Sequence, residues 1–271
     1  CNLYMTHWPN SKSQITRQPS VFITGASSGL GAALALQYAR AGYVLGLVAR
    51  RQPELEAVVA SLPRQHFTYL LDVRDREALH AAAADFMKQT GGAVDVVIAN
   101  AGVSAGTLTE STDDFAVFKE IFDINVLATV ATFEPFIPAM VALGSGRLVG
   151  IASVAGVRGL PGAGAYSASK SAVATYCEAL RLEMAPKGVS VVTIAPGYVK
   201  SEMTAVNTYH MPFLLPADVF ARRAAKAIEH RRRYIVIPWQ MGWVARLMRL
   251  IPPALYDRLA SNAPRKKRRS S

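Results

Sequence analysis

The sequence places a tyrosine and a lysine four residues apart, a spacing that brings two side chains onto one face of a helix. These residues are Tyr166 and Lys170. An unperturbed tyrosine has a pKa of about 10 and is a poor acid–base group at neutral pH, but a nearby ammonium group favours the phenolate and lowers that pKa. Ser153 could add a hydroxyl that holds the same substrate oxygen. The three residues therefore predict proton transfer at an oxygen atom, with a chance pairing on a helix face as the alternative.

A glycine-rich turn lies near the start of the chain. Residues 24–31 read Thr-Gly-Ala-Ser-Ser-Gly-Leu-Gly, between an apolar run and an Ala-rich stretch that is typical of a helix. Glycines let the backbone pass close to a pyrophosphate, and the free N–H groups at the start of a helix attract its charge. We therefore expect a dinucleotide here, with an ordinary glycine-rich loop as the alternative. The expected contacts are Gly25, Ser27, Ser28, Gly29, Leu30 and Gly31.

The end of the second apolar run indicates which dinucleotide is bound. It closes at Ala49 and is followed by Arg50 and Arg51. An acidic residue at this place would accept hydrogen bonds from the ribose hydroxyls and select NAD. Because the acid is missing and two guanidinium groups suit a 2′-phosphate, the sequence predicts NADP rather than NAD. A pair of solvated surface charges is the alternative.

Apolar segments alternate with helical segments along the chain, and this alternation positions the motifs. Strands are expected at 20–24, 43–49, 67–71, 93–99, 146–153, 189–195 and 234–237, and helices at 30–41, from 53, and at 76–89, 113–143, 166–185 and 216–230. Nearly all-apolar strands of this kind are typical of a parallel sheet covered on both faces. The predicted fold is therefore α/β, a Rossmann-type doubly wound parallel sheet in a single domain, with ligands at the carboxyl ends of the strands.

Composition excludes several other classes of protein. A chain of 271 residues that is 51% hydrophobic can bury a sizeable core, which excludes a disordered or fibrous protein. Two cysteines and five scattered histidines predict neither a disulfide framework nor a metal site. Charged residues and prolines interrupt the apolar runs, so no transmembrane helix is expected, and residues 1–19 lack the apolar core of a signal peptide.

Taken in order, the motifs resemble those of the short-chain dehydrogenase/reductase family in its single-domain form. The similarity covers about residues 20–237. The motifs that carry it are the glycine turn at 24–31, Asp72 and Val73, Asn100, Ala101 and Gly102, Asn125, Ser153, Tyr166, Lys170, and Pro196 and Gly197. Two positions depart from the family pattern: Ala99 stands where an Asn is usual, and Ser201 stands where a Thr is usual. Neither departure removes a catalytic group.

The resemblance implies a role for each matched residue. Tyr166 would act as the general acid or base, Ser153 would polarise the carbonyl, Lys170 would hold the nicotinamide ribose and lower the pKa of Tyr166, and Asn125 would hold a water that connects Lys170 to solvent. Asp72 and Val73 would contact the adenine. The remaining implied cofactor contacts are Asn100, Ala101, Gly102, Tyr166, Lys170, Pro196, Gly197, Val199 and Ser201.

The segment at 200–216 lies where this family closes over its substrate. It carries Met203, Val206, Met211, Phe213, Leu214 and Leu215. Flexible, Met-rich segments suit apolar ligands, and the alternative is that these side chains only pack the segment onto the body. Arg158 could meet an acidic substrate or face solvent, and we expect it to face solvent.

The chain beyond the matched region is basic. Residues 218–271 hold 14 Lys and Arg against three acidic residues, which accounts for the whole net charge of +11. We expect an N-terminal extension at 1–19 that is flexible, the catalytic domain at 20–237, a helical extension at 238–262 and a basic disordered tail at 263–271. Apolar residues recur in the extension at helical spacing: Trp239, Trp243, Val244, Leu247, Leu250 and Ile251. Packing of this helix on the body or on a second subunit is favoured over anchoring at a membrane surface.

These observations predict an NADP-dependent reductase or dehydrogenase that acts on an apolar ketone or secondary alcohol. The alternatives are a lipid-type or ketoacyl reductase at a membrane surface, and a non-catalytic protein that senses NADP. A homodimer or homotetramer is expected, in the cytoplasm, with peripheral membrane contact through the C-terminus left open. Nucleic acid is not expected as a partner, because no stacking aromatics accompany the basic tail.

Overall fold

The computed structural model describes residues 17–64, 66–205, 207, 209–261, 266 and 268. Its centre is a parallel sheet of seven strands in the order β3-β2-β1-β4-β5-β6-β7. The strands are β1 (Ser20–Thr24), β2 (Val44–Ala49), β3 (Phe67–Leu70), β4 (Val96–Ala99), β5 (Gly146–Ile151), β6 (Val189–Pro196) and β7 (Tyr234–Ile237). The chain reverses its direction of travel across the sheet between β1 and β4, so a crevice at their carboxyl ends can hold a ligand. The predicted Rossmann-type α/β fold in a single domain is confirmed.

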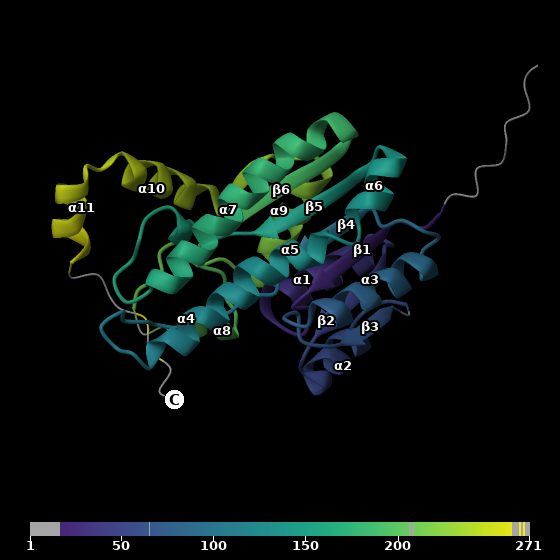
Figure 1. Cartoon of the computed structure of the whole chain (residues 1–271), viewed down its shortest axis with the longest axis horizontal. Coiled ribbons are helices and arrows are strands. Elements are labelled where there is room, and N and C mark those ends of the chain that lie inside the picture. Colours follow the sequence, from purple (N-terminus) through teal and green to yellow (C-terminus); the bar gives the residue numbers. More distant parts are fainter. Residues whose placement is uncertain are drawn as a thin grey trace, which may run out of the picture.

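Helices cover both faces of the sheet (Figure 1). Successive residues of a strand point to opposite faces, so that Phe22 joins one core cluster, whereas Val21 and Ile23 join the other. On one side lie α1 (Gly29–Arg40), α2 (Gln52–Ala60) and α9 (Ala217–Glu229). On the other side lie α3 (Arg76–Gln89), α5 (Ala128–Phe133), α6 (Ile137–Leu143) and α7 (Gly164–Met184). Burial on both faces explains why the strands are nearly all apolar.

The expected helix at 113–143 consists of consecutive pieces. They are α4 (Asp114–Phe122), a π-helical stretch η1 (Asp123–Leu127), α5 and α6, with a turn at Glu134–Phe136 where Pro135 interrupts the helix. By length and composition, Asp114–Leu143 could cross a membrane, which the sequence did not lead us to expect. However, α4 packs on α7, and α5 packs on α3 and β4, so this helical segment is an integral part of the core.

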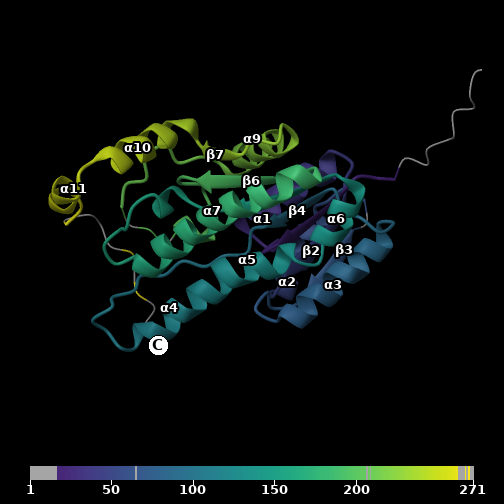
Figure 2. The same ribbon diagram turned by 45° about the horizontal axis from the view of Figure 1, so that its top comes forward.

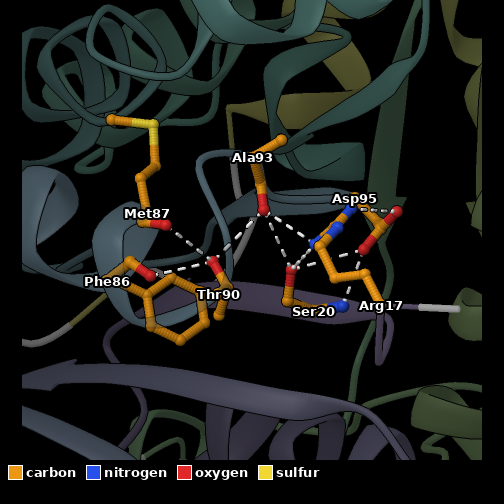
Figure 3. A network of polar contacts seen from close by, with 7 residues as sticks. All are labelled: Arg17, Ser20, Phe86, Met87, Thr90, Ala93 and Asp95. Carbon is orange, nitrogen blue, oxygen red and sulfur yellow. Dashed lines mark hydrogen bonds and ion pairs between the residues drawn. The ribbon is translucent and has the colours of Figure 1, made fainter. Parts of the chain in front are cut away.

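Polar contacts fix the end of the sheet opposite the carboxyl edge (Figure 3). Arg17 donates to the carbonyl of Ala93 at 2.8 Å and to the Asp95 carboxylate at 3.0 Å. The other carboxylate oxygen of Asp95 accepts from the Ser20 N–H at 2.7 Å. β4 begins at Val96, three residues later than the sequence predicts, and the Ala93 carbonyl and the Asp95 side chain belong to this network. Of the N-terminal extension, residues 1–16 lie outside the described residues, and Arg17 is bound to the body.

Two helices follow the sheet, α10 (Trp239–Leu250) and α11 (Pro253–Ala260). They extend outward from one end of the body in both views (Figure 1, Figure 2). α10 packs on β7 through Met241 and Ala245, which are buried. The face that the sequence singled out is exposed instead, with Trp239 at 64%, Trp243 at 57% and Leu247 at 62% of full exposure. The extension does pack on the body, but through the opposite face of the helix.

Candidate active site

A cavity of about 850 Å³ opens at the carboxyl edge of the sheet. Its walls come from the loops that follow β1, β2, β4, β5 and β6, and from the first half of α7. Most of the predicted site residues line it: Gly25, Ser27, Ser28, Gly29, Leu30, Arg50, Arg51, Val73, Asn100, Ala101, Gly102, Ser153, Tyr166, Lys170, Pro196, Gly197, Val199 and Ser201. Gly31, Asp72 and Asn125 are not among the lining residues and contribute from behind the wall.

The glycine turn closes on the loop that follows β4. Gly25 has a φ of +68°, and a Cβ there would lie 2.8 Å from Cα of Ala101. A Cβ on Gly31 would collide with the carbonyl of Gly25, so this glycine is needed for packing and not for ligand contact. The Asn100 side chain donates to the carbonyls of Thr24 and Gly25 at 3.0 and 3.1 Å. These contacts hold the turn rigidly at the start of α1.

The start of α1 is free to bind an anion. Ser28 is the N-cap residue but makes no capping hydrogen bond with its side chain, and the first turn carries no acidic residue. The first N–H groups of a helix lack partners within the helix and carry its positive dipole end. The residues present therefore fit the pyrophosphate of a nicotinamide dinucleotide.

The two arginines after β2 stand at the far end of the cavity from Tyr166. Arg51 donates to the Ser28 hydroxyl at 2.8 Å and pairs with Glu202 at 3.2 Å. Arg50 pairs with Asp72 at 3.2 Å, and Arg74 also binds this carboxylate, so the pKa of Asp72 falls to about 2. Hydrogen bonds from Arg74 are the largest cause of that shift. The Asp72 side chain therefore faces arginines, and Val73 lines the cavity.

Tyr166 and Lys170 lie on the first turns of α7, and Ser153 lies two residues after the end of β5. The Lys170 ammonium donates to the carbonyl of Ile151 at 2.7 Å, and its Nζ lies 6.0 Å from the centroid of the Tyr166 ring. Burial lowers the pKa of Lys170 to about 8. Burial also raises the pKa of Tyr166, and a hydrogen bond with Ser153 opposes that rise.

The expectation that Lys170 lowers the pKa of Tyr166 stays a prediction. Lys170 is not among the causes that shift this pKa. Its ammonium group donates to the backbone carbonyl of Ile151, and with a pKa of about 8 the side chain is still mostly protonated at neutral pH. A bound cofactor would change the surroundings of both groups and with them the pKa of Tyr166.

Asn125 connects three segments behind the cavity wall. It lies in the π-helical stretch η1, and such stretches often occur at functional sites. Its side chain accepts from the Val103 N–H at 2.8 Å and donates to the Val103 carbonyl at 3.0 Å and to the Ser169 hydroxyl at 2.9 Å. Asn125 therefore joins the loop after β4 to α7, one residue away from Lys170.

The segment that follows β6 forms another wall. Thr204, in the short helix α8 (Glu202–Ala205), accepts from the Ser201 N–H and donates to the Val199 carbonyl at 2.8 Å. Of the apolar side chains expected to cover the substrate, Met203 lines the cavity. Leu215 packs into the core, Phe213 and Leu214 are exposed, and Val206 lies outside the described residues.

Sequence reasoning missed the contribution of α10. Met241, Val244, Ala245 and Met248 line the cavity. Their helical spacing did not single out this face, because Trp239, Trp243 and Leu247 follow the same spacing on the exposed face. The interpretation of Arg158 was also wrong. Instead of facing solvent, it donates to the carbonyls of Met248 and Ile251 at 3.1 and 2.9 Å and lies 4.0 Å from the Tyr256 ring centroid. Arg158 therefore fixes the end of α10.

Two residues of the basic tail contact the site. Lys266 lines the cavity and donates to the Ser104 hydroxyl, and Arg268 pairs with Asp114. For these two residues the expectation of a solvated, disordered tail does not hold. The rest of 263–271 lies outside the described part of the chain.

Comparison with known proteins agrees with this geometry. The family model for short chain dehydrogenase matches residues 19–211. An uncharacterized oxidoreductase of Myxococcus xanthus is 38% identical over 89% of this chain and 96% of its own length, and epidermal retinol dehydrogenase 2 of Mus musculus is 34% identical over 86% and 78%. A short chain dehydrogenase/reductase from Burkholderia phymatum, solved in complex with NAD, superposes with a TM-score of 0.77 at 26% identity and covers 85% of this chain and 92% of its own. The chain belongs to the short-chain dehydrogenase/reductase family and is an oxidoreductase.

Proposed function

We propose that this protein reduces an apolar ketone, or oxidises the corresponding secondary alcohol, with NADP as its cofactor. The observation that carries this proposal is one cavity in which a glycine turn and an uncapped helix start lie at one end, and Ser153, Tyr166 and Lys170 lie at the other. A dinucleotide that binds along this cavity brings its nicotinamide next to the three side chains.

The preference for NADP rests on the end of β2. Ala49 provides no carboxylate for ribose hydroxyls, and the guanidinium groups of Arg50 and Arg51 both line the cavity. Guanidinium groups bind phosphate through charge-assisted hydrogen bonds. In the structure Arg50 pairs with Asp72, and Arg51 pairs with Glu54 and Glu202. A bound 2′-phosphate would replace or share these partners.

In reduction, Tyr166 donates its hydroxyl proton to the carbonyl oxygen, and Ser153 donates a hydrogen bond to the same atom. NADPH supplies the hydride that adds to the carbonyl carbon, so that ketone, NADPH and a proton give alcohol and NADP⁺. Lys170 presents a buried ammonium that binds ribose hydroxyls and favours the phenolate form left after the proton is transferred. Asn125 positions this lysine through Ser169 and the loop at Val103.

The substrate end of the cavity suits an apolar body. It is lined by Leu160, Met203, Met241, Val244 and Met248. Methionine side chains adapt to varied apolar shapes. A relative that is 34% identical is named for retinol, which is an apolar alcohol. We therefore propose a ketone or alcohol attached to a hydrocarbon skeleton.

Transfer of deuterium tests this function directly. The protein is incubated with NADPH deuterated at C4 and with a panel of aliphatic and cyclic ketones, and the alcohols are analysed by mass spectrometry. The expected result is an alcohol that carries one deuterium. If no ketone in the panel gains deuterium from either NADPH or NADH, the proposal is wrong, and a protein that only senses the dinucleotide is favoured.

Two further proposals concern assembly and location. Members of this family typically form oligomers, and Phe115, Leu127 and Leu182 on α4, η1 and α7 are exposed, so we propose that this face binds a second copy.

We also propose a cytoplasmic enzyme that touches an anionic membrane through α10 and α11. Large apolar side chains exposed on those helices favour this contact: Trp239, Trp243, Leu247, Leu250, Leu255 and Leu259.

A further inference from the structure

A lysine from the C-terminal tail reaches the substrate end of the cavity. Lys266 Nζ donates to the hydroxyl of Ser104 at 2.5 Å and lies 5.3 Å from the centroid of the Tyr166 ring. Both Lys266 and Ser104 line the cavity together with Ser153 and Tyr166. The ammonium group therefore stands beside the place where the proposed reaction occurs, although 100 positions separate it from Tyr166 in the sequence.

Arg268 holds this segment against the body. Its guanidinium group binds both carboxylate oxygens of Asp114, at 2.9 and 3.0 Å, and the hydroxyl of Ser111 at 2.6 Å. Asp114 is only 4% exposed, and it also accepts from the Leu108 N–H at 2.7 Å. Two-pronged pairing of arginine with a buried carboxylate is geometrically specific, so the position of Lys266 is built into the fold.

In the part of the chain that the structure describes, Lys266 has no negatively charged partner at the substrate end. Among the described residues that line the cavity, the other charged side chains are Arg50, Arg51, Lys170 and Glu202. Glu202 pairs with Arg51 at the adenosine end, and Lys170 binds the carbonyl of Ile151. Within the described part of the chain, the Lys266 ammonium contacts two neutral groups, the hydroxyl of Ser104 and the Tyr166 ring.

Burial makes this arrangement costly for the free protein. It lowers the pKa of Lys266 to about 8, so the side chain is still mostly protonated at neutral pH. A partly buried cation without an anionic partner is unfavourable unless a ligand supplies the charge. One ammonium and one hydroxyl match a group with a single negative charge better than a dianion.

We propose that Lys266 is a specificity-determining residue that binds the carboxylate of an oxo-acid or hydroxy-acid substrate. This inference rests on the proposed function and names its substrate class: a hydrocarbon body with a carbonyl at Tyr166 and a carboxylate a few bonds away at Lys266. The apolar lining contacts the chain that joins the two groups.

The test uses the full-length protein and matched probes that differ only in charge. The probes are 4-oxopentanoate, 5-oxohexanoate and 6-oxoheptanoate, each compared with its methyl ester. Two quantities are measured: kcat/KM with NADPH, and Kd by calorimetry without cofactor. The variants are Lys266→Ala, Lys266→Arg as a rescue, and Lys187→Ala, which removes an exposed lysine at the far end of α7.

The wild type is expected to prefer at least one acid over its ester. Lys266→Ala should lower kcat/KM for that acid roughly ten- to a hundredfold, the effect of losing one charge-assisted hydrogen bond, and should leave the ester unchanged. Lys266→Arg should keep part of the preference, and Lys187→Ala should keep all of it. Kd for the acid should rise most in Lys266→Ala and should keep the wild-type value in Lys187→Ala.

Several results would overturn the inference, and they differ from failure of the proposed function. Equal acid-to-ester ratios in the wild type and Lys266→Ala would refute it. If Lys266→Ala accelerated acid and ester alike, the lysine would block the cavity instead of binding substrate. If the wild type reduced nothing but bound an acid through Lys266, the proposed reaction would fail while the carboxylate site would stand.

Discussion

At the residue scale, the buried Lys170, for which we propose a role in the reaction, carries an energetic cost. It is 5% exposed, its ammonium group has one backbone partner, and its pKa falls from 10.5 to about 8 because of burial. Removing a charge from water is costly unless the charge is well paired. Functional sites commonly hold such groups and sacrifice stability for them.

This cost predicts a pH-dependent stability. Below about pH 8, Lys170 is protonated in both the folded and the unfolded chain, so burial of its charge destabilises the fold in full. Between about pH 8 and 10.5 the unfolded chain binds more protons, so the stability contributed by this residue rises with pH. Lys170→Met lacks this titrating group. Its stability advantage over the wild type, measured as the difference in free energy of unfolding, should therefore shrink by about 2–3 kcal/mol between pH 7 and pH 10. Urea titrations at each pH measure the free energies of unfolding of the variant and the wild type, with Lys187→Met as the control. A difference that is independent of pH contradicts this account.

Arg50 is predicted to select the cofactor. Arg50→Asp removes one phosphate partner and supplies an acceptor for ribose hydroxyls, and it also loses the contact with Asp72. Affinity for NADPH should fall roughly ten- to a hundredfold, which corresponds to a charge-assisted contact of about 1.5–3 kcal/mol, and use of NADH should improve. Fluorescence titration with each dinucleotide measures this. An unchanged ratio of the two affinities would exclude Arg50 from the choice, whereas a partial change would point to Arg51.

At the element scale, local motifs were predicted well and long-range contacts were not. The glycine turn, the strand ends and the Tyr166 and Lys170 pair depend on short spacings that a sequence displays directly. α10 is apolar on both faces, with Met241 and Ala245 on one and Trp243 and Leu247 on the other, so its pattern did not show which face is buried. The contacts of Arg158 and Lys266 join segments about 90 or more residues apart, and no local pattern indicates them.

Arg158 is predicted to hold α10 against the cavity. Its guanidinium group binds two carbonyls at the end of α10 and stacks on Tyr256, whose hydroxyl donates to the carbonyl of Gly159 at 2.7 Å. Arg158→Ala should raise KM several-fold more than it lowers kcat, because α10 lines the substrate end and not the reacting atoms. Steady-state kinetics measure this, with Arg246→Ala as the control, since Arg246 is exposed beside Trp243. Equal effects of the two substitutions would show that Arg158 has no special role.

At the scale of the whole molecule, the two ends of the sheet have separate tasks. At the amino ends of β1 and β4, Arg17, Ser20 and Asp95 are joined by hydrogen bonds. The cavity lies at the carboxyl ends of the strands, where open α/β sheets bind their ligands. α10 contributes to both the cavity and the outer surface, because Met241 lines the cavity and Trp243 is exposed. A substrate that partitions into a membrane would therefore meet the enzyme close to its site.

Contact with a membrane is predicted to need both the apolar face and the charge. The full-length protein should bind vesicles of anionic lipid at low salt and leave them as salt rises, because charges act over about 8 Å at physiological ionic strength. Leu247→Glu combined with Leu250→Glu should weaken binding, since both side chains are exposed on α10, and turnover should be retained. Vesicle sedimentation measures this against neutral lipid. If the full-length protein ignores anionic vesicles at low salt, the apolar face has another occupant, such as a second subunit.

The most direct test of the central claim, that the cavity performs acid–base chemistry beside a nicotinamide, is the comparison of Tyr166→Phe with the wild type. The substitution removes one hydroxyl and leaves the ring, so the neighbouring Lys170 and Lys266 keep their positions. NADPH oxidation with a responsive ketone is measured together with the Kd for NADPH. The account predicts that kcat falls by roughly 10² to 10⁴ while Kd stays the same. A Tyr166→Phe protein that turns over the ketone at the wild-type rate would contradict it.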